Sequence, residues 1–216
     1  MKKIFFLLIV LSTFKISFSQ DEKTQYIRKG LFRAQGTISP GILLKENAST
    51  ISLHGGLEYY VADNVSLRGD SYYFLQAKDG NDFAPFEFNH SIFSGASYHF
   101  KTKNHFDPYI AIEPGIAISK RKSYSGVIEC FTTPCPGEIE INGRATANPL
   151  FSSAIGFNFF FQKWFHLFGE VRYVTGKNIA DDSAFPIALP PAPLSLNELK
   201  FSFGLGFNLN LIKKKE

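Results

Sequence analysis

The sequence lacks an apolar segment long enough to cross a membrane as a helix. Such a helix needs ~20 apolar residues, whereas the run Ile4–Leu11 has only eight, and Lys15 interrupts its extension. Two lysines precede this run and the polar stretch ending at Ser19 follows it, which is the layout of a secretory signal peptide. We expect residues 1–19 to be removed and residues 20–216 to form one domain. The alternative is a buried N-terminal strand.

Cysteine is scarce, with only Cys130 and Cys135 in the chain. Neither lies near the expected cleavage point, so we do not expect a lipid-anchored N-terminus. An exported chain meets an oxidising compartment, which favours a local disulfide between them. Closing so short a ring stabilises a fold by only ~2 kcal/mol, so we expect it to shape a loop. The spacing does not match a paired CxxC metal site, and we expect no metal and no cofactor.

Positive charge is not concentrated anywhere in the chain. Loss of residues 1–19 would remove three lysines and leave 20 basic against 19 acidic side chains, so the pI of 8.9 overstates the basicity. The basic residues neither cluster on one face nor interleave with stacking aromatics in a nucleic-acid motif. Nucleic acid is therefore not an expected partner.

Helical periodicity is also missing, because no stretch shows a sustained i, i+3, i+4 apolar stripe. Beyond residue 29, segments with period-two apolar patterning alternate with turn and loop composition. The patterning predicts eight strands and little or no helix. The strands are expected near residues 30–43, 49–61, 65–77, 87–101, 107–120, 146–161, 165–176 and 198–211.

The connections between these strands alternate in length. Short turns are expected at 63–64, 103–105 and 162–164. Long connections are expected at 78–86, 121–145 and 177–197, and the connection 44–48, which belongs to the same end of the barrel, is the weakest of them. Membrane barrels have short periplasmic turns and longer outer loops. The expected strand lengths also suit tilted membrane strands better than globular ones. The pattern predicts an all-β fold, an eight-stranded antiparallel up-and-down transmembrane β-barrel with its termini in the periplasm.

The two faces of each strand differ in polarity and in size. In the last strand, Phe201, Phe203 and Leu205 alternate with Ser202, Gly204 and Gly206. A soluble barrel with an apolar pocket shows the same alternation, but its outer face should carry Lys, Glu and Thr. Small residues suit the narrow interior of an eight-stranded barrel, so we place the small and polar face inside. Such residues are Gly95, Ser97, Gly115, Ser152, Ala154, Gly156, Gly204 and Gly206.

Aromatic residues gather near the expected short turns, as at Tyr59–Tyr60, Phe159–Phe161 and Trp164–Phe165. Strand lysines are scarce and lie at strand ends. Aromatic girdles of this kind mark the membrane interfaces of barrels. The sequence therefore predicts an outer-membrane location in a Gram-negative bacterium.

With the strands placed, the chain resembles the outer-membrane β-barrel domain family of small porin-like proteins of Bacteroidota, and more distantly barrels of the OmpA and OmpX type. The motifs that carry the resemblance are Gly56–Tyr60, Val65–Asp70, Asp107–Ile110 and Gly169–Tyr173, together with the last strand. The resemblance covers residues 20–212 and implies a barrel rather than any activity. It also implies outer-membrane lipid and the barrel assembly machinery as partners. The chain departs from the usual aromatic ending, because it continues past Phe207 to a lysine-rich tail.

Charged residues on the inner face balance each other. We expect an ion-pair network that plugs the lumen, because an unpaired buried charge is costly. The alternative is a selectivity ring in a narrow pore, but aqueous channels belong to barrels of ~16 strands or more. The predicted network consists of Arg33, Glu58, Arg68, Asp70, Glu113, Glu170, Arg172 and Lys200.

Hypotheses of a catalytic function have little support in the sequence. Glu58 and Asp70 could serve as an acid and base pair, but arginine neighbours hold carboxylates ionised. A lipid A modifying barrel enzyme could use a His and Ser pair, yet His90 and Ser91 are adjacent and point to opposite faces of a strand. His54 and His99 are more typical of hydrogen-bonded interior residues. We expect no catalytic residue and no enzyme.

The outer connections are the remaining place for function. The last one carries Pro186, Pro190, Pro191 and Pro193, and proline-rich segments are comparatively stiff, as suits a displayed binding surface. We expect a non-enzymatic protein that stabilises the envelope or presents these loops to an unknown extracellular partner. The alternatives are a narrow channel or transporter for small solutes or lipids, and the lipid A modifying enzyme.

Overall fold

The protein is described by a computed structural model. It describes residues 29–78, 86–100, 105–122, 124–127, 138–141, 144–179 and 195–210. The expected signal peptide, the cysteine pair, the four loop prolines and the tail from 211 to 216 lie outside the described residues. No described residue belongs to a helix long and apolar enough to cross a membrane.

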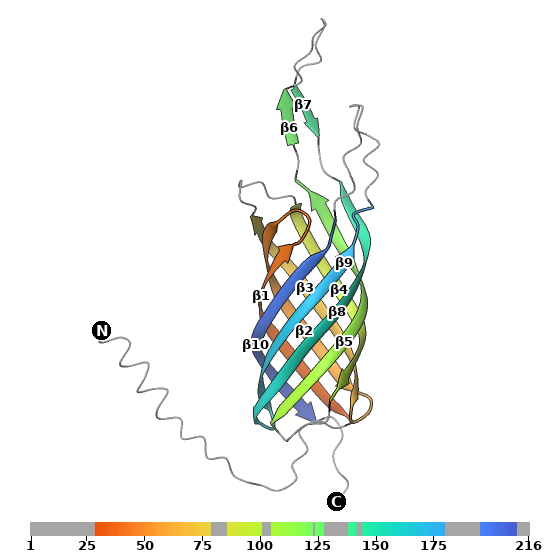
Figure 1. Cartoon of the computed structure of the whole chain (residues 1–216), viewed down its shortest axis with the longest axis vertical. Coiled ribbons are helices and arrows are strands. Elements are labelled where there is room, and N and C mark those ends of the chain that lie inside the picture. The colour runs from red at the N-terminus through yellow and green to blue at the C-terminus, as the bar shows by residue number, and fades with distance from the viewer. Residues whose placement is uncertain are drawn as a thin grey trace, which may run out of the picture.

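Eight long strands form a closed antiparallel barrel, as the alternating sequence predicts (Figure 1). When the barrel strands alone are counted, seven of the eight neighbouring pairs join strands that follow each other along the chain, and β1 pairs with β10 to close the wall. Each strand has 12 to 18 residues, long enough to cross a membrane at a tilt. The strands are β1 (Leu31–Leu43), β2 (Ala48–Tyr60), β3 (Val65–Lys78), β4 (Phe86–His99), β5 (Phe106–Arg121), β8 (Ala145–Gln162), β9 (Phe165–Gly176) and β10 (Glu198–Asn210).

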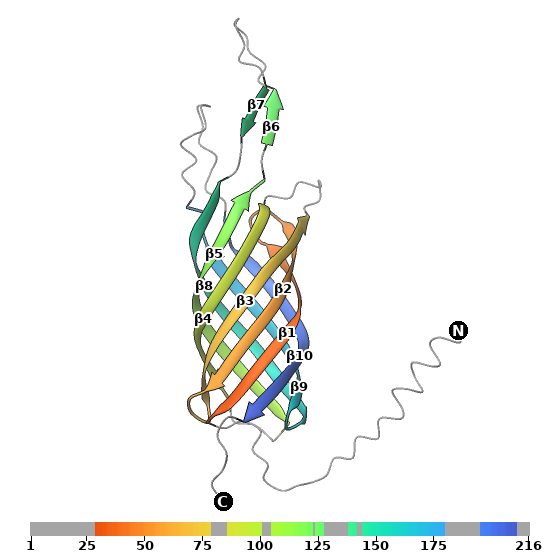
Figure 2. The ribbon, with the colours of Figure 1, turned by 180° about the vertical axis from the view of Figure 1, so that it is seen from behind.

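The predicted strand boundaries differ from these by at most two residues. The connection between β5 and β8 contains structure that the sequence did not predict. There, β6 (Tyr124–Val127) and β7 (Glu138–Ile141) pair as a two-stranded sheet. Figures 1 and 2 show this pair beyond the barrel rim, above the ends of β5 and β8. The segments are only four residues long, too short for period-two patterning to stand out.

The β2–β3, β4–β5 and β8–β9 connections share one end of the barrel with the start of β1 and the end of β10 (Figure 2). The longer connections lie at the opposite end, together with the four-residue turn 44–47 between β1 and β2. Asn47 in this turn has a positive φ of 50°, which asparagine tolerates. Short turns face the periplasm in membrane barrels. We therefore call the end with the short turns the periplasmic end and the opposite end the outer end.

The closure between β1 and β10 depends partly on side chains. Backbone pairing with β10 is interrupted between Gly36 and Gly41, where Pro40 has no N–H to donate. The hydroxyls of Thr37 and Ser39 donate instead to carbonyl oxygens of β10, at 2.5 and 2.9 Å. These bonds satisfy wall carbonyls that the ladder leaves open.

The outside of the barrel is mostly apolar over the middle of the strands, where exposed polar side chains are uncharged, as at Ser71, Ser94 and Ser153. Ile92, Ile155 and Phe203 have exposed fractions of 65%, 70% and 64%. Within the eight barrel strands, the charged residues that are not buried lie at the outer ends, namely Lys78, Glu87, Lys120 and Arg121. An apolar band with no charge over its middle belongs in hydrocarbon, since water penalises such a surface.

Aromatic side chains border the periplasmic end of this band. Trp164 stacks on Phe207 with ring centroids 6.1 Å apart, and Tyr98 contacts Phe100 edge-on at 5.3 Å. Trp164 is 55% exposed. Amphipathic rings favour the level of the lipid headgroups, so these residues mark the membrane interface at this end.

A charge placed in the middle of the band should be costly. We expect Ile112→Arg to lower the free energy of unfolding in lipid vesicles by about 2–4 kcal/mol. The matched control is Leu209→Arg near the end of β10. Both side chains are exposed to a similar extent, 56% and 58%, but the control should cost about 0–1 kcal/mol because it lies near the interface. Equal losses in urea titrations would contradict a lipid-facing exterior.

Candidate functional site

The eight residues of the predicted network all point into the barrel. Each is at most 5% exposed, and they come from β1, β2, β3, β5, β9 and β10. Strand alternation explains this placement, because the two faces of a tilted strand point to lipid and to the interior. The structure brings them together in three groups rather than in one continuous network.

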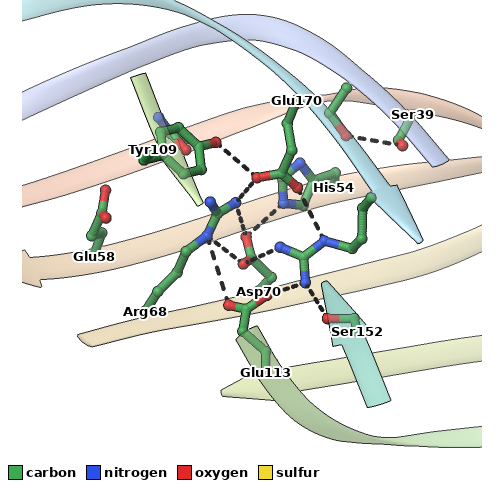
Figure 3. Close-up of polar contacts among 12 residues, drawn as sticks. Ser39, His54, Glu58, Arg68, Asp70, Tyr109, Glu113, Ser152 and Glu170 are labelled. Carbon is green, nitrogen blue, oxygen red and sulfur yellow. Dashed lines mark hydrogen bonds and ion pairs between the residues drawn. The ribbon is translucent and has the colours of Figure 1, made fainter. Parts of the chain in front are cut away.

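The central group joins two arginines to three carboxylates (Figure 3). Arg68 contacts Asp70 at 2.5 Å and Glu170 at 2.6 Å. Arg172 contacts Asp70 at 2.8 Å and Glu170 at 3.0 Å, and also pairs with Glu113. Each guanidinium thus serves at least two carboxylates, which is the fork geometry that makes arginine suited to buried ion pairs.

Tyrosine, histidine and phenylalanine side chains complete the central group. The Tyr109 hydroxyl donates to Glu170 at 2.8 Å, and Nε2 of His54 lies 2.7 Å from Asp70. The Arg172 guanidinium also lies over the rings of Tyr72 and Phe93, at 5.6 and 5.3 Å from their centroids. Aromatic faces attract cations most strongly where water is excluded, so these rings add to the stabilisation of the buried charge.

A second group lies near the periplasmic end. Arg33 contacts Glu58 at 3.0 Å and Asp107 at 3.3 Å. The two nitrogens of His99 face the same two carboxylates, at 2.9 Å from Glu58 and 2.8 Å from Asp107. All four side chains are buried, and Tyr60 donates to Asp107 at 3.3 Å. The group occupies the interior of the barrel near its periplasmic end.

The third group lies near the outer end, where Lys200 contacts Glu198 at 2.8 Å and Glu198 accepts a hydrogen bond from Thr50. At this level apolar side chains pack beside buried polar ones such as Ser119 and Asn148. A buried cluster fills the outer end of the barrel, with Phe88 packed against it. Its members are Leu43, Ala48, Tyr72, Phe74, Ala77, Phe86, Phe93, Ala117, Leu150, Val174 and Leu196.

The sequence analysis did not predict three members of these ion-pair groups, nor the division into three groups. Asp107 and Glu198 pair with the predicted residues, and His99 was expected only as a hydrogen-bonded interior residue. Parity could have found them, because Asp107 shares the inner face of its strand with Tyr109 and Glu198 shares that of Lys200. The partners of Asp107 and His99 could not be found, because they depend on the register between strands, whereas Glu198 and Lys200 are two residues apart on one strand.

The candidate catalytic pairs are not assembled. Glu58 and Asp70 belong to different groups, each held by its own arginine. Ser91 is buried inside the barrel, whereas His90 lies on the outside and stacks on Tyr73 at 4.3 Å between ring centroids. Among the described residues, no group of three or more His, Cys, Asp or Glu side chains could hold a metal ion.

The fold and the interior define a closed eight-stranded transmembrane β-barrel of the kind found in outer membranes, in agreement with the fold and location expected from the sequence. No family of known proteins matches the sequence, and no curated protein matches it. Solved structures with this fold are similar over most of their length, at sequence identities that show the fold alone.

Three of these structures are bacterial barrels. OprG of Pseudomonas aeruginosa is 11% identical, with a TM-score of 0.55, and the match covers 87% of this chain and all of that one. The N-terminal barrel domain of OprF from the same species is 12% identical, with a TM-score of 0.52 and coverage of 84% and 99%. The neisserial surface protein NspA is 11% identical, with a TM-score of 0.53 and coverage of 84% and 97%.

Removing one partner of the central group should leave buried charge unpaired. We expect Arg172→Met to lower the free energy of unfolding by about 3–5 kcal/mol. The control, Lys45→Met, removes an exposed basic side chain in the turn between β1 and β2 and should change stability by at most about 0.5 kcal/mol. Fluorescence of Trp164, the one tryptophan of the chain, reports unfolding in urea. Similar values for the two variants would show that the central ion pairs do not stabilise the barrel.

Gly95 makes room for the central group, because it pairs with Arg68 and faces β5. A Cβ atom there would lie 2.8 Å from the Glu113 Cα, too close for any real contact. We expect Gly95→Ala to cost about 1–3 kcal/mol through overpacking. Gly69→Ala is the control, since its nearest neighbour would lie at 3.8 Å. Thermal unfolding of both variants measures the difference. Equal stability of Gly95→Ala and Gly69→Ala would contradict the expected overpacking.

Proposed function

We propose that the protein is a non-enzymatic outer-membrane barrel with a closed lumen, which acts as a scaffold that presents its outer connections to an extracellular partner. The observation that carries the proposal is the filled interior. Three groups of paired charges occupy successive levels from the periplasmic end to the outer end, and an apolar cluster packs around the outer two of them. A lumen packed in this way favours a function at the surface over passage of a solute.

The base of the last outer connection is held firmly to the rim. Ile179 donates its backbone N–H to the Asn148 side chain at 2.8 Å where the connection leaves the barrel. Where it returns, Leu44 donates to the Asn197 carbonyl at 2.9 Å, and Leu196 is buried in the apolar cluster. The described residues at both ends of the connection are therefore fixed to the rim before any partner binds. Such preorganisation lowers the entropic cost of binding.

The pairing of the buried carboxylates with arginines supports the non-enzymatic part of the proposal. Each carboxylate of the central group has an arginine partner, and His90 and Ser91 lie on opposite sides of the wall. A general base must reach the proton that it removes. No pair of these residues offers that geometry.

Planar-bilayer recording of the folded full-length protein tests the closed lumen. We expect no steady discrete conductance, because salt ions would have to displace paired charges at three levels. Folding is checked on the same sample by a mobility difference between boiled and unboiled protein on a gel. Steady openings from protein that passes this check would favour the channel instead. An altered lipid A mass in cells that express the protein would favour the enzyme.

A further inference from the structure

Basic side chains gather on one sector of the outer rim, where β3, β4, β5 and β8 meet the membrane boundary. We call Lys78, Lys120, Lys122 and Arg144 the rim patch. Lys78, Lys122 and Arg144 are exposed, and the side chain of Lys120 is 30% exposed. The acids among the described residues of this sector are Glu87, whose Oε2 lies 2.6 Å from the Lys120 Nζ, and Glu138 and Glu140 of β7, which lies beyond the rim above β5 and β8 (Figure 1). With Arg121 at the end of β5, the described part of the sector contains five basic residues and these three acids. The patch therefore carries a net positive charge.

Strand pairing places these residues beside each other. Lys120 pairs with Phe88 of β4 on one side and with Ala145 of β8 on the other. Arg144 comes immediately before Ala145 and is exposed at the rim, but strand alternation does not put it on the same face as Lys120. Lys78 ends β3, which neighbours β4 in the barrel. Neighbouring strands lie ~4.8 Å apart, so the four basic side chains span a region about three strand spacings wide.

The patch lies at the height of lipid headgroups. On β5 the outward positions from Phe106 to Ile118 are apolar, and Lys120 is the next outward residue. Fourteen residues at ~3.3 Å each, tilted by ~40°, rise by ~35 Å along the membrane normal. The hydrocarbon core is ~30 Å thick and the bilayer with its headgroups ~40–45 Å. With Phe106 at the periplasmic interface, Lys120 lies in the outer headgroup layer.

Apolar side chains continue directly below the patch. Ile116 and Ile118 are 56% and 52% exposed, and Ile92 of the neighbouring strand is 65% exposed. A ligand for this surface therefore needs negative charge at the headgroup level and acyl chains beneath it. Lysine binds phosphate as a point charge, and arginine binds it through its fork of donors.

We propose that the rim patch binds the phosphate groups of a phosphorylated glycolipid in the outer leaflet. The lipid phosphates neutralise the patch while the acyl chains cover the isoleucines below it. Binding of this kind anchors the barrel in its leaflet and fixes its orientation. The proposal depends on the outer-membrane location and not on the closed lumen, so a conducting protein would leave it intact.

The test measures binding of bisphosphorylated lipid A to the folded full-length protein in detergent micelles by native mass spectrometry. The patch variant carries Lys78→Gln, Lys120→Gln, Lys122→Gln and Arg144→Gln. We expect its dissociation constant to rise at least tenfold, while dephosphorylated lipid A binds both proteins weakly. The matched control removes four exposed lysines elsewhere, at positions 29, 45, 163 and 177, and should bind like the unaltered protein.

Each remaining outcome decides against the proposal. Unchanged binding by the patch variant, an equal loss in the control, or equal binding of dephosphorylated lipid A would overturn it. Competition by millimolar inorganic phosphate would assign the patch to a free anion instead of a lipid. The boiled and unboiled mobility check verifies folding. If the fourfold variant does not fold, Lys122→Gln with Arg144→Gln should still raise the dissociation constant at least threefold, and no change would count against the lipid.

Discussion

The interior of an eight-stranded barrel is only wide enough for packed side chains, and this narrowness governs the rest of the structure. Because little water can enter, an inward polar group must bond to another interior group or remain unsatisfied at high cost. Arg172 illustrates the result, since its guanidinium serves Asp70, Glu113 and Glu170 and also lies against two aromatic rings. The small residues of the inner face, such as Gly95, provide the space that these side chains need.

The same constraint separates the two surfaces of the barrel by role. The charged residues of the interior form ion pairs with each other, so few of them are available for catalysis or transport. The outside is apolar through the membrane and carries basic residues where the strands emerge. The proposed functions therefore lie at the outer end, in the connections held at the rim and in the basic sector beside them, and the interior keeps the wall in shape.

The fold was predictable from the sequence because alternation is a local property. The run from Phe201 to Leu209 shows it without any knowledge of neighbours, and the same parity placed Glu170 and Arg172 inside. Contacts between strands are not local. Arg33 of β1 reaches Asp107 on β5, and Arg172 of β9 reaches Asp70 on β3. These partners depend on registers that include irregularities, such as the one between Phe160 and Gln162, which no pattern in the sequence marks.

The packed interior is tested most directly by the side-chain N–H signals of its arginines. In nitrogen-edited NMR spectra of the folded protein in micelles, a guanidinium that is bonded to carboxylates and shielded from water exchanges its Nε proton slowly. This account predicts persistent Nε signals from Arg33, Arg68 and Arg172 at neutral pH, while exposed Arg144 loses its signal to exchange with water. Equally rapid exchange at the three interior arginines and at Arg144 would contradict a closed, dry interior.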